Sequence, residues 1–247
     1  MKKLDHRELL DAGVHFGHLK SKWDPKMLQY IFLEKKGIHL IDLKKTIIKA
    51  EEAAAALKQI AKSGRKILFV ATKKQAKEQV KQMAESINMP FVTERWLGGM
   101  LTNFGTIKKS IKKMQTIDTL LADESNTSLT KKERLMMERQ KTKLNNVLGG
   151  MKDMNRIPAA VYMVDVFHEH IALAESRKLG VRTFGMVDTN SNPSLVDFPI
   201  PSNDDASKSI KIITEYIVEA IKEGLAERES KSKTKKAVAE KKEDKKA

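Results

Sequence analysis

The sequence predicts an α/β fold: a doubly wound, mainly parallel sheet with an inserted antiparallel α-helical hairpin. The apolar segments 66–72 and 159–165 have the short length and β-rich composition of buried parallel strands. Longer helical segments alternate with such strands, which indicates βαβ units with helices on both faces of the sheet. Residues 106–148 interrupt this alternation with two consecutive amphipathic helices, which together predict the hairpin.

The first 64 residues predict a short helix, a β-hairpin and a long helix. The first helix ends at Gly13, and the hairpin turns at Lys35-Lys36-Gly37, where glycine can adopt a positive φ. Asp42 is placed to cap the long helix, which ends at Gly64.

The remaining globular segments follow the same alternation. Their predicted ranges are a strand at 66–72, a helix at 73–88, strands at 90–94 and 159–165, a helix at 168–179, a strand at 181–188 and a final helix at about 205–224. An irregular stretch with Pro193, Pro199 and Pro201 precedes the final helix. Residues 1–105 plus 150–224 therefore form one predicted α/β domain.

Residues 106–149 are predicted to form a protruding helical hairpin. Ile107, Ile111, Met114, Ile117 and Leu121 recur at helical spacing, and Gly149-Gly150 ends the second helix. At 1.5 Å per residue this arm extends roughly 25 Å. The basic tail, residues 225–247, has no aromatic residue and very few large apolar ones, so its composition predicts disorder.

Positive charge is concentrated in the first part of the chain. The formal net charge is +15; residues 1–149 hold 30 basic and 16 acidic side chains, whereas residues 150–224 hold 8 and 11. This polarity is typical of a protein that presents one face to a polyanion, first of all a nucleic acid. The absence of cysteine excludes disulfides, thiolate metal sites and cysteine nucleophiles, and no apolar run is long enough to predict a membrane span.

The phosphate-binding motifs of nucleotide enzymes are missing. Neither G-x-G-x-x-G nor G-x-x-x-x-G-K-[ST] occurs, and the turn after the strand 66–72 carries bulky side chains where a pyrophosphate needs close backbone approach. We therefore expect no cofactor and no small-molecule substrate. Lys73 and Lys74 in that turn either contact an external phosphate or are simply solvated.

A cation-dependent enzyme is the main alternative. Asp165 and Asp188 follow predicted strands at the edge where doubly wound sheets bind ligands, and Asp204 and Asp205 could come near. Helix capping by Asp205 and a turn at 188–190 explain these residues equally simply, and we favour that interpretation.

The histidine pairs His15/His18 and His168/His170 do not form a closed ligand set, so they predict packed or surface histidines and no metal. A structural metal near His15 and His18, or near the aspartates, stays an open alternative.

The segment 95–104, Arg-Trp-Leu-Gly-Gly-Met-Leu-Thr-Asn-Phe, joins the sheet to the arm. Trp96 and Phe104 are predicted to fix the arm, while Arg95 and Asn103 are free to meet a phosphate. The lysine pairs 108–109 and 112–113 repeat at i, i+4, and Lys131 and Lys132 lie on the same arm. Like charges at this spacing repel each other, and a phosphate backbone relieves that repulsion.

Several segments identify a known family: LLDAGVHFGH, WDPKMLQYIF, IDLKKT, ATKKQA, RWLGGMLTNFGTI and VDTNSNPSLVDFPIPSNDDASKSI. Between residue 5 and about residue 224 the chain resembles the bacterial small-subunit ribosomal protein S-two (S2) family. This resemblance implies a Rossmann-like or flavodoxin-like domain with a coiled-coil arm and no catalytic activity. It also implies a cytoplasmic place in the small ribosomal subunit, binding to 16S ribosomal RNA and neighbouring proteins, and docking of ribosomal protein S-one for messenger RNA capture.

Basic side chains are the expected RNA contacts, because lysine and arginine neutralise phosphates without reading much base sequence. The candidates are Lys22, Lys26, Lys73, Lys74, Arg95, Lys108, Lys109, Lys112 and Lys113. The alternatives that stay open are a cation-dependent α/β enzyme using Asp165 and Asp188 and, less favoured, a membrane-surface protein.

Overall fold

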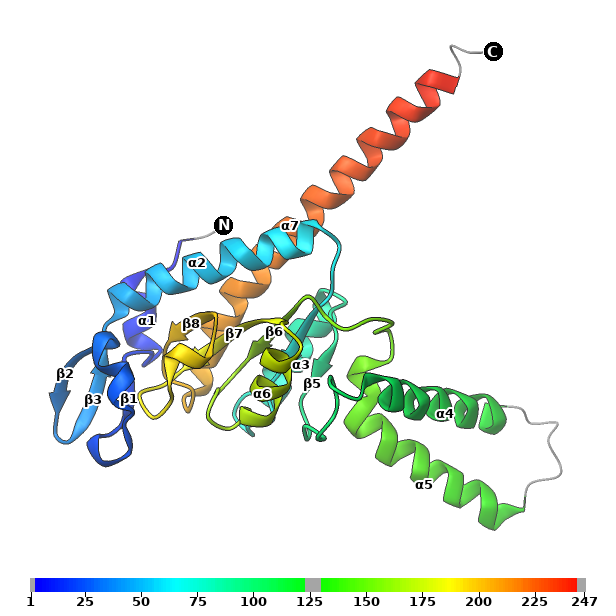
Figure 1. Ribbon diagram of the computed structural model, residues 1–247, viewed down its shortest axis with the longest axis horizontal. Coiled ribbons are helices and arrows are strands. Elements are labelled where there is room, and N and C mark those ends of the chain that lie inside the picture. Colours follow the sequence, from blue (N-terminus) through cyan, green and yellow to red (C-terminus); the bar gives the residue numbers. More distant parts are fainter. Residues whose placement is uncertain (1–2, 123–129, 244–247) are drawn as a thin grey trace.

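The computed structural model describes residues 3–122 and 130–243, and its centre is a five-stranded parallel sheet (Figure 1). The strand order is β5-β4-β6-β7-β8, so the order along the sheet reverses between β4 and β6. The strands are β4 (Ile67–Val70), β5 (Phe91–Val92), β6 (Ala160–Met163), β7 (Arg182–Val187) and β8 (Phe198–Pro201). The predicted parallel sheet is confirmed.

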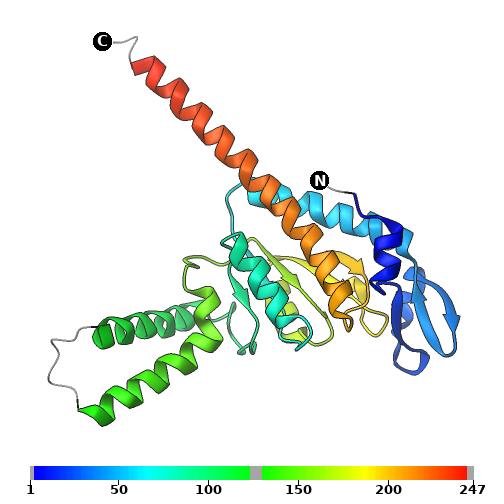
Figure 2. The same ribbon diagram turned by 180° about the vertical axis from the view of Figure 1, so that it is seen from behind.

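Helices cover both faces of this sheet, which confirms the doubly wound fold (Figures 1 and 2). One face packs on α2 (Leu43–Lys62), α3 (Lys77–Ser86) and α7 (Ser207–Glu243), through buried side chains such as Phe69 and Tyr162. The other face packs on α6 (His170–Lys178) and on the segment leading into the arm, through Leu68 and Val161. Consecutive strand residues thus belong to different cores, as the alternation of a strand requires.

A smaller antiparallel sheet forms an N-terminal lobe with the short helix α1 (His6–Asp11). Its order is β1-β3-β2, with β1 (Phe16–Leu19), β2 (Ile31–Lys35) and β3 (Ile38–Ile41), and the 3-10 helices η1 (Lys20–Lys22) and η2 (Pro25–Tyr30) join β1 to β2. The predicted hairpin is confirmed, with positive φ at Lys36 and Gly37. Asp42 caps α2 by accepting the Lys44 N–H at 3.0 Å.

Strand β8 lies in a stretch that the sequence predicts to be irregular, after the 3-10 helix η4 (Pro193–Leu195). Pro199 and Pro201 lack the N–H groups that a central strand needs. In the structure β8 is the edge strand beside β7, where a missing donor on the outer side costs nothing. The prolines therefore indicate an edge strand and not an irregular segment.

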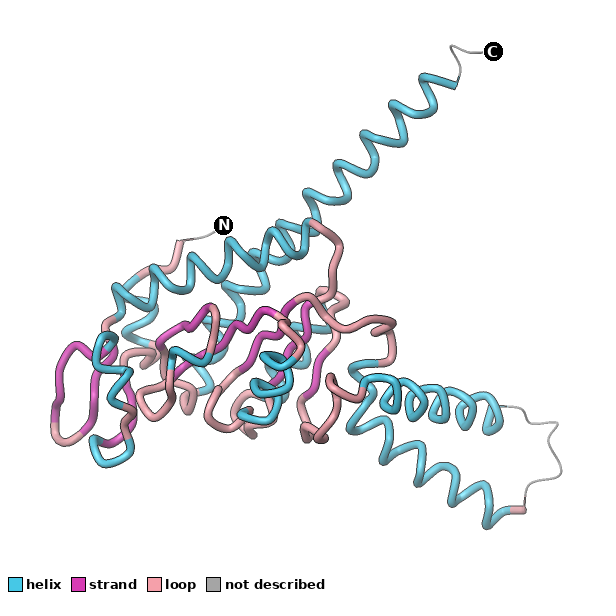
Figure 3. The backbone as a smooth tube through the Cα atoms, in the orientation of Figure 1, coloured by secondary structure: helices cyan, strands magenta, loops and turns pink. Residues whose placement is uncertain are grey.

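Two helices, α4 (Phe104–Ala122) and α5 (Lys131–Leu148), run antiparallel and project away from the sheets as an arm (Figures 1 and 3). Asp118 of α4 and Lys141 of α5 form an ion pair of 2.8 Å across it. The 3-10 helix η3 (Gly149–Met151) ends the arm at the predicted glycines. Residues 123–129, which join the two helices, lie outside the described residues, and the finer prediction of a coiled coil stays a prediction.

Helix α7 is longer than the sequence predicts. The composition predicts disorder from residue 225 onward, whereas the chain continues as helix to Glu243. Ala, Glu, Lys and Arg, which all favour helix, dominate this segment, and no Gly or Pro follows Gly224. Lys58 of α2 holds the start of this extension through ion pairs with Glu223 and Glu227. Among the helices of residues 3–122 and 130–243, none is long and apolar enough to cross a membrane.

Candidate functional site

The carboxyl edge of the parallel sheet collects most of the candidate residues. Parallel strands end on the same side, so the loops after β5, β4, β6 and β7 lie along one edge in that spatial order. These loops contain, in turn, Arg95, Lys74, Asp165 and Asp188. The helix η2 joins the same edge, because the backbone N–H of Asp24 donates to the carbonyl of Thr189 at 2.8 Å.

Seven of the nine candidate cations are exposed, and within the described chain none of the seven has a carboxylate within 4.0 Å. They are Lys22, Lys26, Lys74, Arg95, Lys109, Lys112 and Lys113. Lys108 is half-buried, with its Nζ 3.5 Å from the carbonyl of Asn155. The structure does not gather the seven at one point, because the lobe that carries Lys22 and Lys26 lies at the opposite end from the arm (Figure 1).

Lys73 differs from the other candidates. Its ammonium lies 2.6 Å from Asp205, 2.8 Å from Asp204 and 3.1 Å from Asp165, and its side chain is 16% exposed. Burial lowers the pKa of Lys73, but the charge of Asp204 and the hydrogen bonds to Asp204 and Asp205 outweigh it and raise the pKa well above its usual value. The charge of Lys73 is therefore balanced inside the protein.

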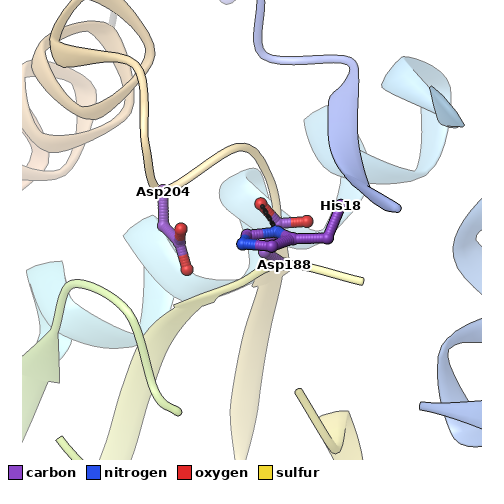
Figure 4. A group of neighbouring side chains, drawn as sticks. All are labelled: His18, Asp188 and Asp204. Atoms are coloured by element: carbon purple, nitrogen blue, oxygen red, sulfur yellow. Dashed lines mark ion pairs between the residues drawn. The ribbon is translucent and has the colours of Figure 1, made fainter. Parts of the chain in front are cut away.

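Four aspartates surround Lys73 and His18. We call this group of six residues the acidic cluster; its members are His18, Lys73, Asp165, Asp188, Asp204 and Asp205. The Nδ1 of His18 lies 3.0 Å from Asp188 Oδ2, and this hydrogen bond raises the pKa of His18. Burial, with the charges of Asp188 and Asp165, raises the pKa of Asp204 to about 8. Figure 4 shows His18, Asp188 and Asp204 turned toward one another.

The structure tests the predicted capping and turn roles of the aspartates and the predicted packing of the histidines. Asp205 does not cap the final helix; the side chain of Asn203 accepts the backbone N–H groups of Asp205 and Ala206 at that turn. The turn role of Asp188 is confirmed, since its Oδ1 accepts from Thr189. His18 joins the aspartates, whereas His15 packs against Phe16 with the ring centroids 4.1 Å apart.

The acidic cluster occupies the place where this type of sheet binds nucleotides. The reversal of strand order lies between β4 and β6, and Lys73 and Asp165 follow these two strands. Three buried carboxylates at this point repel a phosphate, and the Lys73 charge that could attract one is already paired. The edge therefore has exposed cations without carboxylate partners on its flanks and not in its crevice.

A buried carboxylate organises the elbow between β5 and the arm. Glu175 of α6 is 8% exposed and accepts hydrogen bonds from the backbone N–H groups of Gly99, Leu101 and Thr102, from the Thr102 hydroxyl and from Trp96 Nε1, at 2.7–3.1 Å. Burial raises the pKa of Glu175, but these hydrogen bonds outweigh it and the pKa lies below its usual value. The prediction that Trp96 fixes the arm to the domain is thus confirmed. No pattern in the sequence identifies Glu175 as the residue that Trp96 contacts.

Comparisons with known proteins agree with this architecture. A family model described as ribosomal protein S2 matches residues 9–224. The chain is 60% identical over 227 residues to the small ribosomal subunit protein uS2 of Cytophaga hutchinsonii, covering 92% of this chain and 89% of that relative. It is 55% identical over 230 residues to the protein of the same name from Porphyromonas gingivalis, covering 93% and 82%. A third similar protein of that name, from Christiangramia forsetii, is 58% identical over 228 residues, covering 92% and 76%.

Proposed function

Because this chain belongs to the ribosomal protein S2 family, whose members are structural proteins of the small ribosomal subunit and not enzymes, we propose that it binds 16S ribosomal RNA in the cytoplasm. The observation that carries this proposal is the set of seven exposed cations without a carboxylate partner in the described residues, on the N-terminal lobe, at the sheet edge and on the arm. Lys73 is left out of the proposed RNA contacts because its charge is balanced by Asp165, Asp204 and Asp205.

The arm offers the most regular part of the proposed RNA surface. On α4 the buried residues Ile107, Ile111 and Met114 face the protein, and the exposed residues Lys109, Lys112 and Lys113 lie on the other side of the helix. Lysines held this close repel each other in the free protein. Phosphates relieve the repulsion and release their counterions, so binding depends strongly on salt and weakly on sequence.

The test neutralises the arm with the triple change Lys109→Met, Lys112→Met and Lys113→Met. Three lost phosphate contacts should reduce the affinity for 16S RNA about 100-fold near 0.15 M salt and lower the slope of log affinity against log salt by about 2–3. The measurements are the salt dependence of binding and the occupancy of the protein in purified small subunits.

The matched control is a triple change to methionine at Lys178, Lys208 and Lys211, which are exposed in the acidic part of the chain. This variant should bind RNA like the wild type. If the arm variant also keeps wild-type affinity, salt slope and occupancy, the arm does not belong to the RNA surface.

A second proposed function is the docking of ribosomal protein S-one, which the family implies, on the N-terminal lobe. The observation that favours this place is a group of exposed apolar side chains, Leu10, Phe16, Leu19, Leu28 and Phe32, of which Phe32 is 70% exposed. Apolar groups gathered on one lobe are typical of a protein-binding surface.

To test this docking, purified S-one is mixed with the wild type and with the double variant Leu28→Ser and Phe32→Ser. The double variant should lose binding, whereas Met136→Ser, which changes an exposed apolar residue of the arm, should keep it. Equal binding by all three proteins would exclude this surface and leave the RNA proposal unaffected.

A further inference from the structure

Three segments far apart in the sequence bring metal-ligand groups together beside the sheet edge. His18 belongs to β1, Asp188 follows β7 and Asp204 follows β8. One imidazole nitrogen and one oxygen from each carboxylate lie within 4.8 Å of one another. Asp188 is 1% exposed and Asp204 is 0% exposed, and both carboxylates lie beside the His18 ring (Figure 4).

One oxygen of Asp204 is buried without a hydrogen bond. Its Oδ1 accepts from Lys73 at 2.8 Å, but Oδ2 finds no hydrogen-bond partner anywhere in residues 3–122 and 130–243. A buried carboxylate oxygen without a partner is costly, so native proteins satisfy almost all of them. This oxygen therefore needs a ligand that the chain itself does not supply.

The other oxygen of each carboxylate is held in place. Lys73 holds Asp204 Oδ1, and the backbone N–H and hydroxyl of Thr189 both donate to Asp188 Oδ1. Asp204 Oδ2 is thereby left without a partner in the described residues, and Asp188 Oδ2 lies 3.0 Å from His18 Nδ1, so an ion that took the place of the His18 proton would meet both oxygens and the imidazole. Groups that hold the outer atom of a ligand residue in this way are typical of protein metal sites.

The charges of the acidic cluster also require a cation. The acidic cluster contains four aspartates and one ammonium, that of Lys73, and three of the four aspartates are buried. Even with His18 protonated, negative charge is in excess. Excess charge of one sign in a protein interior is strongly destabilising unless an ion or a proton balances it.

We propose that His18, Asp188 and Asp204 bind a divalent transition-metal ion of the zinc class. Zinc accepts imidazole nitrogen and carboxylate oxygen ligands together, whereas magnesium and calcium prefer oxygen ligands alone. Zinc bonds of about 2.0 Å bring two ligands to within about 4 Å of each other, so a small rotation of these side chains brings all three atoms into range.

Such an ion joins the N-terminal lobe to the parallel sheet. The two parts already approach closely there: the His18 N–H donates to Thr189 Oγ1 at 2.8 Å, and a Cβ on Gly17 would lie 2.6 Å from the Thr189 side chain. The role is structural. The ion fixes the lobe, and with it the exposed residues Lys22 and Lys26, against the sheet edge.

The test uses the full chain, stripped with a chelator and dialysed into metal-free buffer. After addition of ZnCl2 and gel filtration, elemental analysis should find about one zinc per chain. At free zinc 100 times the Kd, the Tm should rise by about 5–10 °C. Asp204→Asn and His18→Asn should each weaken zinc binding more than about 100-fold, beyond the usual effect of removing a group that only supports a ligand.

Two controls separate loss of a ligand from loss of folding. His15→Asn and Asp153→Asn remove a histidine and a carboxylate outside the acidic cluster, and both should retain zinc and the rise in Tm. Circular dichroism of the metal-free variants checks that each is folded. Absence of bound zinc in the folded wild type would overturn the proposal, as would full zinc retention by both Asp204→Asn and His18→Asn. An equal rise in Tm with MgCl2 at the same concentration would overturn the assignment to the zinc class.

Discussion

The acidic cluster and the arm use the same residue type in opposite ways. Lys73 is largely buried and contacts three carboxylates, whereas Lys109, Lys112 and Lys113 are exposed and have no carboxylate within 4.0 Å among the described residues. The first lysine stabilises the fold and attracts nothing from outside. The other three weaken their own helix through mutual repulsion and leave their charge available to a partner. The formal net charge of +15 thus counts two kinds of lysine alike: Lys73, whose charge is balanced inside the protein, and the arm lysines, whose charge stays available.

The largest effect on stability should come from Lys73→Met. This change leaves Asp165 and Asp204 buried without their cation, which should lower the free energy of unfolding by about 3 kcal/mol at pH 7 in metal-free buffer. Urea unfolding measures it. Lys74→Met, one residue away and exposed, is the control and should change the stability by less than about 0.5 kcal/mol. Equal stabilities of the two variants would show that Lys73 is not structurally different from its neighbour.

The next effect concerns the carboxylate that holds the arm to the domain. The change Glu175→Gln places a side-chain NH2 group opposite backbone N–H groups that now donate to the carboxylate. Two donors cannot bond each other, so the free energy of unfolding should fall by about 2 kcal/mol. Glu138→Gln, an exposed change on the arm, serves as the control. If both variants unfold at the same urea concentration as the wild type, the elbow does not depend on Glu175.

The same carboxylate predicts a pH dependence. The folded-state pKa of Glu175 lies below its unfolded value of about 4.3, so the unfolded state takes up the proton first. Its contribution to stability is complete above that unfolded value and disappears as the pH falls through the folded pKa. In thermal unfolding between pH 3 and pH 6, the Tm of the wild type should therefore approach the Tm of Glu175→Gln as the pH falls. A constant difference in Tm across this range would contradict the prediction.

The smallest effect should be on the stability of the arm itself. Lys112→Met with Lys113→Met removes two exposed charges that contact no carboxylate in the described residues, so the free energy of unfolding should stay within about 0.5 kcal/mol of the wild type or rise slightly. Urea unfolding checks this value. A clear destabilisation would mean that these lysines serve the fold as Lys73 does.

The elements of the fold were largely predictable, because periodicity and turn residues are local signals. The strand within 66–72, the hairpin turn with its positive φ at Gly37 and the cap at Asp42 all occur as predicted. Strand β1 was missed because its residues Phe16–Leu19 show no alternating burial. Strand β8 was missed because its two prolines are compatible with a strand only at an edge, and no local pattern says which strand lies there.

The candidate site was less predictable, because it depends on contacts between distant residues. The topology rule placed Asp165 and Asp188 at one edge, but nothing local marks His18 as their neighbour or Asn203 as the residue that accepts at the final turn. Glu175 looks like any glutamate on a helix, and its donors lie more than 70 residues earlier. Lysine and arginine positions in the sequence select seven exposed cations, but they also select Lys73, whose carboxylate partners appear only in three dimensions.

The contact between β1 and the loop after β7 sets an order of events during synthesis. His18 and Thr189, which share a hydrogen bond, are 171 residues apart. At about 5–20 residues per second, Thr189 is made roughly 10–30 s after His18. During that time the nascent N-terminal lobe has no sheet edge to pack against. The side chains that later contact the sheet edge are then exposed to solvent, in addition to the apolar side chains that stay exposed in the folded protein. The lobe is thus the first part of the protein to be made and among the last to reach its final place.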